Sequence, residues 1–332
     1  MTEQDPRYIS VTPMKNEGPF VLEWIAHNLA IGVDQIVVMT NDCTDGTDAL
    51  LQRLDDRGIV THVDNNSRRQ TSPQRRAYNS FIKMGVARPQ DWVVVIDADE
   101  HINVKTGDNT LRALTEAIPD AKTISMTWRL FGNAGIERYE DRFLSDQFRR
   151  AARERTIRPP QAWGFKTMFQ PEIWAGLGVH RPKRPTVETM EECHWYNGSG
   201  ELMPDRYYSR SWRSARDSVG YDLVQVNHYA LKSCESYLVK KMRGRAHHLG
   251  ESLGMEYWDM MNQNADADSS IDVILDRKRG HYYDLLSDPE TARLHHMSCD
   301  LHRQQISQLR EQPEMQDLMQ QMTAETSVKT QE

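Results

Sequence analysis

The chain has 332 residues, of which 38% are hydrophobic and 27% charged, so it contains enough apolar side chains for a substantial core. Its 48 acidic and 41 basic residues give a net charge of −7, which argues against nucleic acid as a partner. No apolar run approaches the roughly 18 residues of a membrane span, and the polar start "MTEQDPRYIS" is unlike a signal peptide. We therefore expect a cytoplasmic protein with no transmembrane segment. The four cysteines form no C-x-x-C pair, which argues against a disulfide framework or a zinc ribbon.

The first hundred residues alternate short apolar strands with helices. Strands are predicted at 8–14, 35–40, 59–63 and 92–97. The first helix is predicted at 19–32, and the third begins with Ser72 as N-cap and Pro73 at its first position. Such repeated βα units predict a mainly parallel sheet that is covered on both faces and binds ligands at the carboxyl ends of its strands.

Polar loops follow three of these strands, at 12–17, 40–45 and 97–101. In the last one, "DWVVVIDADEH", Asp97 and Asp99 point to the same side of an extended backbone, where they repel one another unless a cation lies between them. The loop "TPMKNEGP" contains neither G-x-G-x-x-G nor a P-loop, so a divalent cation held by carboxylates is the alternative way to bind phosphate. An isolated D-x-D more often caps a turn or helix, but its place after the fourth strand favours a metal site.

The combination of these motifs in this order is far more specific than any single motif. The segments "TPMKNEGPFVLEWIAHNLAIGVDQIVVMTNDCTDGTDALLQRL", "QRRAYN" and "WVVVIDADEHI" resemble the family-two-like glycosyltransferases of the GT-A fold, over about residues 8–235. The resemblance implies a GT-A (Rossmann-like), mainly parallel α/β sheet flanked by helices. It also implies inverting transfer of a sugar from a nucleoside diphosphate donor to an acceptor hydroxyl, with Mn²⁺ or Mg²⁺ between the Asp97 and Asp99 carboxylates and the diphosphate.

The resemblance further implies which side chains contact the donor. The first polar loop matches the segment along the base and ribose, and the start of the third helix matches one that faces the donor. The end of the second strand lacks the usual acidic residue, which leaves the base open. A basic cluster at 240–245 either neutralises the diphosphate or is solvated. The residues expected at the donor are Thr12, Lys15, Asn16, Glu17, Thr40, Asn41, Gln74, Arg75, Asp97 and Arg243.

His228 ends the apolar stretch "LVQVNH", and the resemblance makes it the third metal ligand, although such a histidine is more often a structural hydrogen-bonder. A neutral imidazole suits Mn²⁺ better than Mg²⁺. The catalytic base is expected in "GVHRPKRPTVETMEECHWYNG", where the familiar Glu-Asp pair is missing. Glu191 is the first candidate for the base and His180 the second. If neither residue is the base, the next candidates are Asp141, Asp146 and Glu172.

The expected organisation is a GT-A domain at 1–235, a helical extension at 236–312 and a disordered tail at 313–332. His295, Cys299 and His302 stand at i, i+4 and i+7 on one face of a predicted helix. These are metal-binding residue types, but a tetrahedral zinc site needs one more ligand than they supply, so a packed face is the simpler interpretation.

Two other functions are compatible with the same motifs. A sugar-phosphate nucleotidyltransferase also holds a metal on an α/β sheet, but it usually has a glycine-rich basic loop that "TPMKNEG" matches poorly. A non-catalytic carbohydrate-binding relative would not need Asp97, Asp99 and His228 intact. For a transferase, the expected acceptor is a carbohydrate or glycolipid, as in polysaccharide biosynthesis, and peripheral contact with a membrane stays open.

Overall fold

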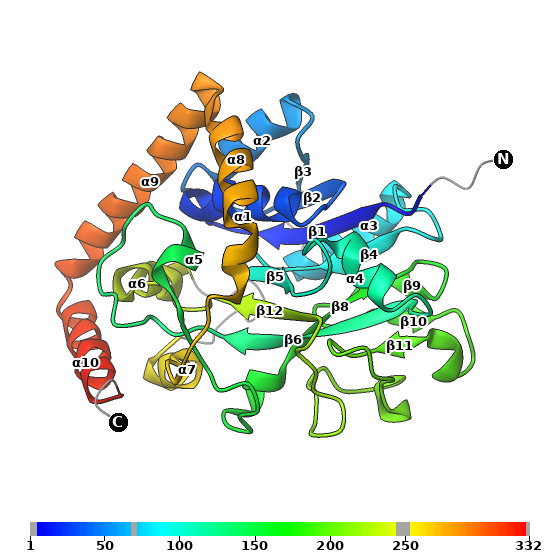
Figure 1. The fold of residues 1–332 in the computed structure, drawn as a ribbon. Helices are drawn as coiled ribbons and strands as arrows, with labels where there is room; N and C mark the ends of the chain where they lie inside the picture. The colour runs from blue at the N-terminus through cyan, green and yellow to red at the C-terminus, as the bar shows by residue number, and fades with distance from the viewer. Residues whose placement is uncertain (1–4, 68–71, 244–252, 330–332) are drawn as a thin grey trace.

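A computed structural model describes residues 5–67, 72–243 and 253–329. A central sheet is flanked by helices on both sides (Figure 1). Its strands are β1 Tyr8–Met14, β2 Gln35–Thr40, β3 Thr61–Asp64, β4 Trp92–Val95, β5 Glu100–Val104, β6 Thr123–Leu130, β8 Phe165–Phe169, β11 Trp195–Tyr196 and β12 Val224–His228. Smaller pairs are formed by β7 Arg150–Ala151 with β13 Asp266–Ala267, and by β9 Trp174–Gly176 with β10 Lys183–Pro185.

The helices connect the strands and then form the C-terminal part of the chain. They are α1 Gly18–Ala30, α2 Thr47–Asp56, α3 Pro73–Met84, α4 Leu111–Ala117, α5 Leu144–Gln147, α6 Cys234–Arg243, α7 Met255–Met261, α8 Leu275–Leu286, α9 Pro289–Arg310 and α10 Pro313–Lys329.

The strand order is β3-β2-β1-β4-β8-β6-β12-β5, with β11 beside β6. The first four strands are parallel, as predicted. β8 runs antiparallel between β4 and β6, and β5 runs antiparallel to β12 at the edge. The mainly parallel α/β fold is therefore confirmed. β9 pairs with β10 and not with β8, although β8 and β9 both lie within residues 165–185.

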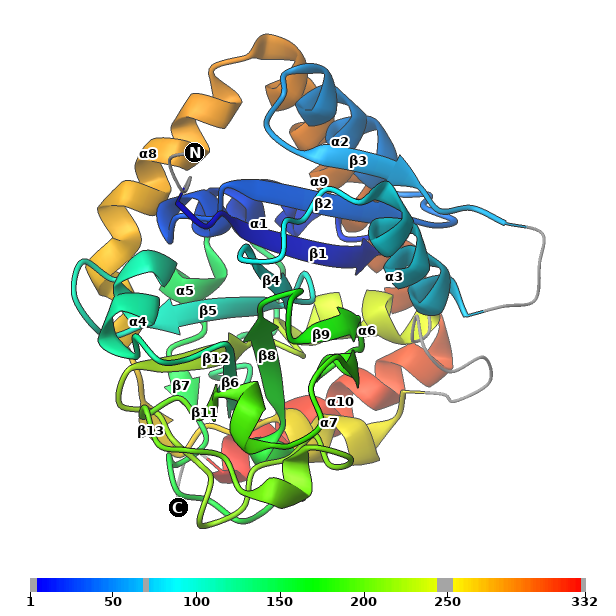
Figure 2. The ribbon, with the colours of Figure 1, turned by 90° about the vertical axis from the view of Figure 1, so that its right-hand side faces the viewer.

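Both faces of the sheet are covered, which explains why β4 is apolar throughout. Val94 belongs to the core on one face, whereas Val93 and Val95 belong to the core on the other. The first core contains side chains of α1, α2, α6 and α9, and α3 contributes to the second (Figure 2). The alternation of side chains along each strand thus fills two cores at once.

The C-terminal helices belong to the same body as the sheet. α8 and α9 both pack on α1, which is consequently buried on almost every side (Figure 1). The polar side of α1 is satisfied within the protein, because Lys278 on α8 donates from Nζ to Glu23 Oε1 at 2.5 Å. The backbone N–H of Leu144 donates to the same carboxylate at 2.8 Å.

The predicted domain boundaries stay a prediction, and two features of the structure bear on them. The boundary at residue 235 falls inside α6, which packs against α9. The predicted disordered tail is instead helical, since α10 begins at Pro313 and continues to Lys329. Met315, Leu318 and Met322 on α10 are buried in the main core, which stabilises a helix whose composition alone suggested fraying. Within the described residues, no helix combines the length and apolar character that crossing a membrane requires.

Candidate active site

A cavity of about 390 Å³ lies at the carboxyl ends of β4 and β12 and beside the loop after β1. Its wall contains three acidic, three basic and several aromatic side chains. The charged and imidazole residues that line it are Lys15, Glu17, Asp97, Asp99, His180, His228, Lys240 and Arg243. The structure thus brings the first and third predicted polar loops to one cavity, whereas the loop at 40–45 does not line it.

Strand register explains why His228 lies beside Asp99. After β4 the chain turns through 97–99 and returns as β5, which pairs antiparallel with β12 so that Glu100 lies opposite His228. The N–H of Tyr229 donates to the carbonyl oxygen of Asp99 at 2.8 Å and fixes this turn. As a result, His228 Nε2 is 3.7 Å from Asp99 Oδ1.

Asp97 is held by a buried lysine that the sequence analysis missed. Lys166 lies within β8 with no exposed side-chain surface, and its Nζ is 2.8 Å from Asp97 Oδ2 and 3.2 Å from Glu100 Oε2. A buried ammonium group requires such anions, because losing its hydration is costly. Burial raises the pKa of Glu100 to about 8 even though the Lys166 ammonium opposes that shift. Because Lys166 Nζ contacts the Asp97 carboxylate, Asp97 is the ion-pair partner of this lysine.

Asp99 pairs through one carboxylate oxygen with a different lysine from that of Asp97, and its other oxygen faces His228. Lys240 Nζ donates to Asp99 Oδ2 at 2.7 Å. Burial opposes ionisation of Asp99, but the charges of Lys240 and its neighbours hold the pKa of Asp99 well below its usual range. Burial lowers the pKa of His228 to about 4, so its imidazole is neutral at pH 7. A neutral imidazole beside a carboxylate is a suitable donor set for a divalent cation.

The predicted ligands differ in whether their atoms lie close enough together to bind one cation. Two metal–ligand bonds of about 2.1 Å can join atoms up to about 4.2 Å apart, and Asp99 Oδ1 and His228 Nε2 are within this limit at 3.7 Å. Asp97 does not join them, because in the described part of the chain the one group of three converging metal-ligating side chains lies elsewhere. Of the expected triad of Asp97, Asp99 and His228, the structure therefore brings Asp99 and His228 within this limit, while Asp97 pairs with Lys166.

The loop after β1 is held by Arg243. Its Nη1 donates to the carbonyl oxygens of Lys15 and Asn16 at 2.8 and 2.5 Å, and its Nη2 donates to the Glu17 carboxylate. Lys232 Nζ lies 3.4 Å from the same carboxylate. Arg243 lines the cavity, but these bonds make it a support of the loop instead of the predicted diphosphate contact. Arg245, from the same basic cluster, lies outside the described residues.

Six predicted donor residues do not line the cavity. Thr12 is fully buried and donates to the carbonyl oxygen of Ile96 at 2.8 Å, which ties β1 to β4. Asn16 bonds to Thr44, so it joins two loops. Of the others, three are buried and one is exposed, and they are Thr40, Asn41, Gln74 and Arg75. Side chains next to a rim point into the sheet as often as into the ligand space, and the donor-binding role of these six residues stays a prediction.

The two predicted bases lie in different places. His180 lines the cavity, whereas Glu191 is exposed and lies next to β11. β11 pairs with the start of β6, where Trp195 is opposite Thr123, while the cavity is lined by Trp128 near the other end of β6. Glu191 therefore lies apart from the cavity that His180 lines, and its role as the base stays a prediction. The reserve candidates Asp141, Asp146 and Glu172 do not line the cavity either.

His180 has a defined tautomer and an aromatic environment. Its Nδ1 lies 3.3 Å from the carbonyl oxygen of Phe165, which can only accept, so Nδ1 carries the proton and Nε2 keeps its lone pair. Burial lowers the pKa of His180 to about 3, which keeps it neutral. The ring stacks on Trp212 with centroids 4.3 Å apart and meets Trp128 edge-on. Both tryptophans line the cavity, so one wall is aromatic.

The mainly parallel sheet with acidic residues at the end of β4 has the architecture of the GT-A fold. The family model for glycosyltransferase family 92 matches residues 6–197, more than half of the chain, and the protein belongs to that family. The sequence resemblance named family two instead. Its motifs lie in the strands and rim of the fold, so they indicated the class of enzyme but not the family.

A relative that carries the name of the same family is distant from this chain in sequence. A glycosyltransferase family 92 protein of Ricinus communis is 24% identical over 132 residues, which are 38% of this chain and 23% of the relative. The match thus spans less than a quarter of that relative's length.

Similar solved structures match about half of the chain. S. aureus TarS in complex with UDP has a TM-score of 0.32 at 12% identity, over 50% of this chain and 47% of the other. Glucosyl-3-phosphoglycerate synthase of Mycobacterium tuberculosis, with Mn²⁺, UDP and product, has a TM-score of 0.28 at 17% identity, over 50% and 58%. At these low TM-scores the assignment of the fold rests on the strand order and the family.

Proposed function

We propose that this glycosyltransferase moves a sugar from a nucleoside diphosphate sugar to an acceptor hydroxyl with inversion at the sugar carbon. The observation that carries the proposal is the single cavity in which Asp99 and His228 face Lys15 and the aromatic wall. Membership of family 92 supports glycosyl transfer. The nucleotide donor, the cation and the inverting course are our proposals.

Charge in the cavity suits a diphosphate. The carboxylates of Glu17, Asp97 and Asp99 each have an ammonium or guanidinium partner. The Lys15 ammonium makes no hydrogen bond to the part of the chain that the structure describes, so it is available for an anionic ligand.

We propose Asp99 Oδ1 and His228 Nε2 as the protein ligands of a divalent cation, Mn²⁺ or Mg²⁺. When bound, such a cation neutralises charge on the departing diphosphate. Lys240 supports the site by holding the other oxygen of Asp99 at 2.7 Å, which orients Oδ1 toward His228. Arg243 orders the loop that contains Lys15.

His180 is the proposed base, since it lines the cavity and its Nε2 makes no hydrogen bond to the described residues. Direct displacement at the sugar carbon requires such a group within about 3 Å of the attacking hydroxyl. Trp128 and Trp212 beside it offer the flat apolar faces on which sugar rings stack, which supports a carbohydrate acceptor. The four cysteines are free thiols, which supports the proposed cytoplasmic location.

A donor screen tests the proposal. The purified chain is incubated with UDP-, GDP-, ADP- and CMP-linked sugars with and without Mn²⁺, and release of the nucleotide is measured. We expect hydrolysis or transfer with one nucleoside diphosphate donor. The variant Asp99→Asn, which keeps the side-chain size, should lower that rate by about 10²–10³-fold because it removes an anionic ligand of the cation that neutralises the leaving diphosphate.

Glu191→Gln is the matched control, since it removes an acidic side chain outside the cavity and should keep the parent rate. Circular dichroism of both variants checks the fold. If Asp99→Asn is folded and as active as the parent, the proposed cation site is wrong.

A further inference from the structure

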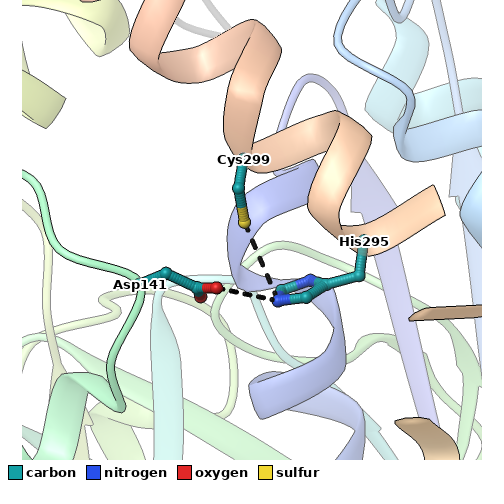
Figure 3. A group of neighbouring side chains, drawn as sticks. All are labelled: Asp141, His295 and Cys299. Carbon is teal, nitrogen blue, oxygen red and sulfur yellow. Dashed lines mark hydrogen bonds and ion pairs between the residues drawn. The ribbon is translucent and has the colours of Figure 1, made fainter. Parts of the chain in front are cut away.

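A second cluster of chemically reactive side chains lies apart from the cavity. Asp141, His295 and Cys299 offer a carboxylate oxygen, an imidazole nitrogen and a sulfur that all lie within 4.8 Å of one another (Figure 3). None of the three lines the proposed active site. The sequence marked His302 in place of Asp141, but His302 bonds instead to Ser236 Oγ at 3.2 Å.

The fold brings these residues together from two separate elements. His295 and Cys299 are one turn apart on the buried face of α9, with 1% and 0% of their surface exposed. Asp141 lies in the connection between β6 and α5, and 27% of its side chain is exposed. The cluster therefore joins α9 to the loop between β6 and α5 (Figure 3).

All polar contacts of the His295 ring converge on one nitrogen. Nε2 is 3.4 Å from Asp141 Oδ2, 3.7 Å from Cys299 Sγ and 3.2 Å from Tyr282 Oη. Nδ1 is buried and has no hydrogen-bond partner in the structure. A Cys-His-Asp relay would place the carboxylate on one ring nitrogen and the thiol on the other. The observed arrangement is instead that of ligands around a shared point.

The distances agree with those between the ligands of one zinc ion. Zinc bonds of about 2.1 Å to nitrogen and oxygen and about 2.3 Å to sulfur, at tetrahedral angles, separate N from O by about 3.4 Å and N from S by about 3.6 Å. The structure gives 3.4 Å and 3.7 Å for these separations. A thiolate and a carboxylate together also balance the double charge of the ion, so the loaded site is neutral.

We propose that Asp141, His295 and Cys299 bind Zn²⁺ and thereby fasten α9 to the loop between β6 and α5. Burial opposes protonation of His295, but its hydrogen bonds to Asp141 and Cys299 raise its pKa to about 9, so binding displaces two protons to solvent, one from the Cys299 thiol and one from the His295 ring. The fourth position of the tetrahedron is left to water. This site is independent of the proposed transferase activity.

Metal analysis and cobalt spectroscopy test the site in the full chain. The protein is stripped with a chelator, titrated with Zn²⁺ in competition with a zinc indicator, and analysed for bound metal after gel filtration. We expect one zinc per chain, with at least tenfold weaker binding in Cys299→Ser. With Co²⁺, the parent should show the near-ultraviolet charge-transfer band of a thiolate ligand, and Cys299→Ser should lack it.

Controls separate this site from other thiols and imidazoles. Cys193→Ser and His302→Gln remove the same residue types elsewhere and should keep the zinc and the cobalt band. Asp141→Asn, at a partly exposed position, should weaken zinc binding while keeping the band, and it serves if Cys299→Ser does not fold. Absence of tight zinc in the folded parent, or a cobalt band that persists in Cys299→Ser, would overturn the proposal.

Discussion

Lys166 illustrates how one buried charge determines the role of its neighbours. It lies in the middle of an apolar strand with no exposed side-chain surface, and it contacts Asp97 and Glu100. Because a buried ammonium group must be compensated, the first aspartate of D-x-D is occupied by the protein itself. The second aspartate, Asp99, retains an oxygen next to His228 and so carries more of the proposed chemistry.

The proposed base gives the prediction at the scale of one residue. His180→Gln keeps a polar side chain but has no basic nitrogen, so turnover should fall by about 10²-fold or more. Donor affinity should stay nearly unchanged, because the base acts mainly in the transition state. The comparison uses kcat and KM for donor and acceptor, with the donor found in the screen.

His281→Gln, a histidine that does not line the cavity, is the control and should behave like the parent. A His180→Gln enzyme with the parent kcat would show that the proton goes to another group. A change confined to donor KM would assign His180 to binding.

At the scale of elements, strands with strong local patterns were predictable and their partners were not. β1 and β2 have the predicted bounds, and β12 ends at His228 as expected. The pairing of β12 with β5 depends on residues more than a hundred positions apart, and no local pattern encodes it. This pairing places His228 beside Asp99. Because no strand pattern reveals the pairing, His228 could be named as a candidate ligand only through the resemblance to known glycosyltransferases.

The C-terminal helices show the same limit. α10 is polar in composition, and it is held by Met315, Leu318 and Met322 in a core formed largely by earlier residues. The sequence itself does point to Lys166, because it is the one charged residue in the strand segment "FKTMF". A lysine at such a position predicts a buried carboxylate partner, and here it would have identified the constraint on Asp97.

The contact between α1 and α8 gives a prediction at this scale. Lys278 and Glu23 have 1% and 7% of their side chains exposed and are 2.5 Å apart. Lys278→Met leaves Glu23 buried without its cation, so the free energy of unfolding should fall by about 3–5 kcal/mol. Urea denaturation at pH 7, followed by circular dichroism, measures the change.

Arg293→Met breaks an exposed pair with Glu290 on α9 and should leave the urea midpoint nearly unchanged. Adding Glu23→Leu to Lys278→Met should recover part of the loss, since it removes the uncompensated carboxylate. An unchanged midpoint in Lys278→Met would mean that α8 is not a stabilising part of the fold.

For the whole molecule, burying polar residues between the sheet and the C-terminal helices makes stability depend on pH. His27 on α1 faces the carbonyl oxygen of Ile102 at 2.8 Å, stacks on His101 and lies near the Lys278 ammonium. Burial lowers the pKa of His27 to about 3, and burial likewise lowers the pKa of His302 to about 3. Both imidazoles are therefore neutral in the folded protein under conditions that protonate them in the unfolded chain.

The sign of the effect follows from where the protons bind. The unfolded imidazole has a pKa of about 6.5, so between this value and about 3 the unfolded state binds protons that the folded state does not. The stabilisation is complete above pH 6.5 and is lost as the pH falls. Each histidine should cost about 2 kcal/mol by pH 5, so the pair removes about 4 kcal/mol, a large part of a typical stability of about 5–15 kcal/mol.

Urea midpoints measured between pH 8 and pH 4.5 should therefore be level above pH 7 and fall steeply below pH 6.5. His27→Gln keeps a donor for the carbonyl oxygen of Ile102 but cannot be protonated, so its loss of stability per pH unit should be smaller by about 1.4 kcal/mol. His296→Gln, which removes an exposed imidazole from α9, should reproduce the slope of the parent. A slope in His27→Gln equal to that of the parent would show that His27 is protonated within the folded protein, and the acid sensitivity would then have to arise from the other buried histidines or from carboxylates.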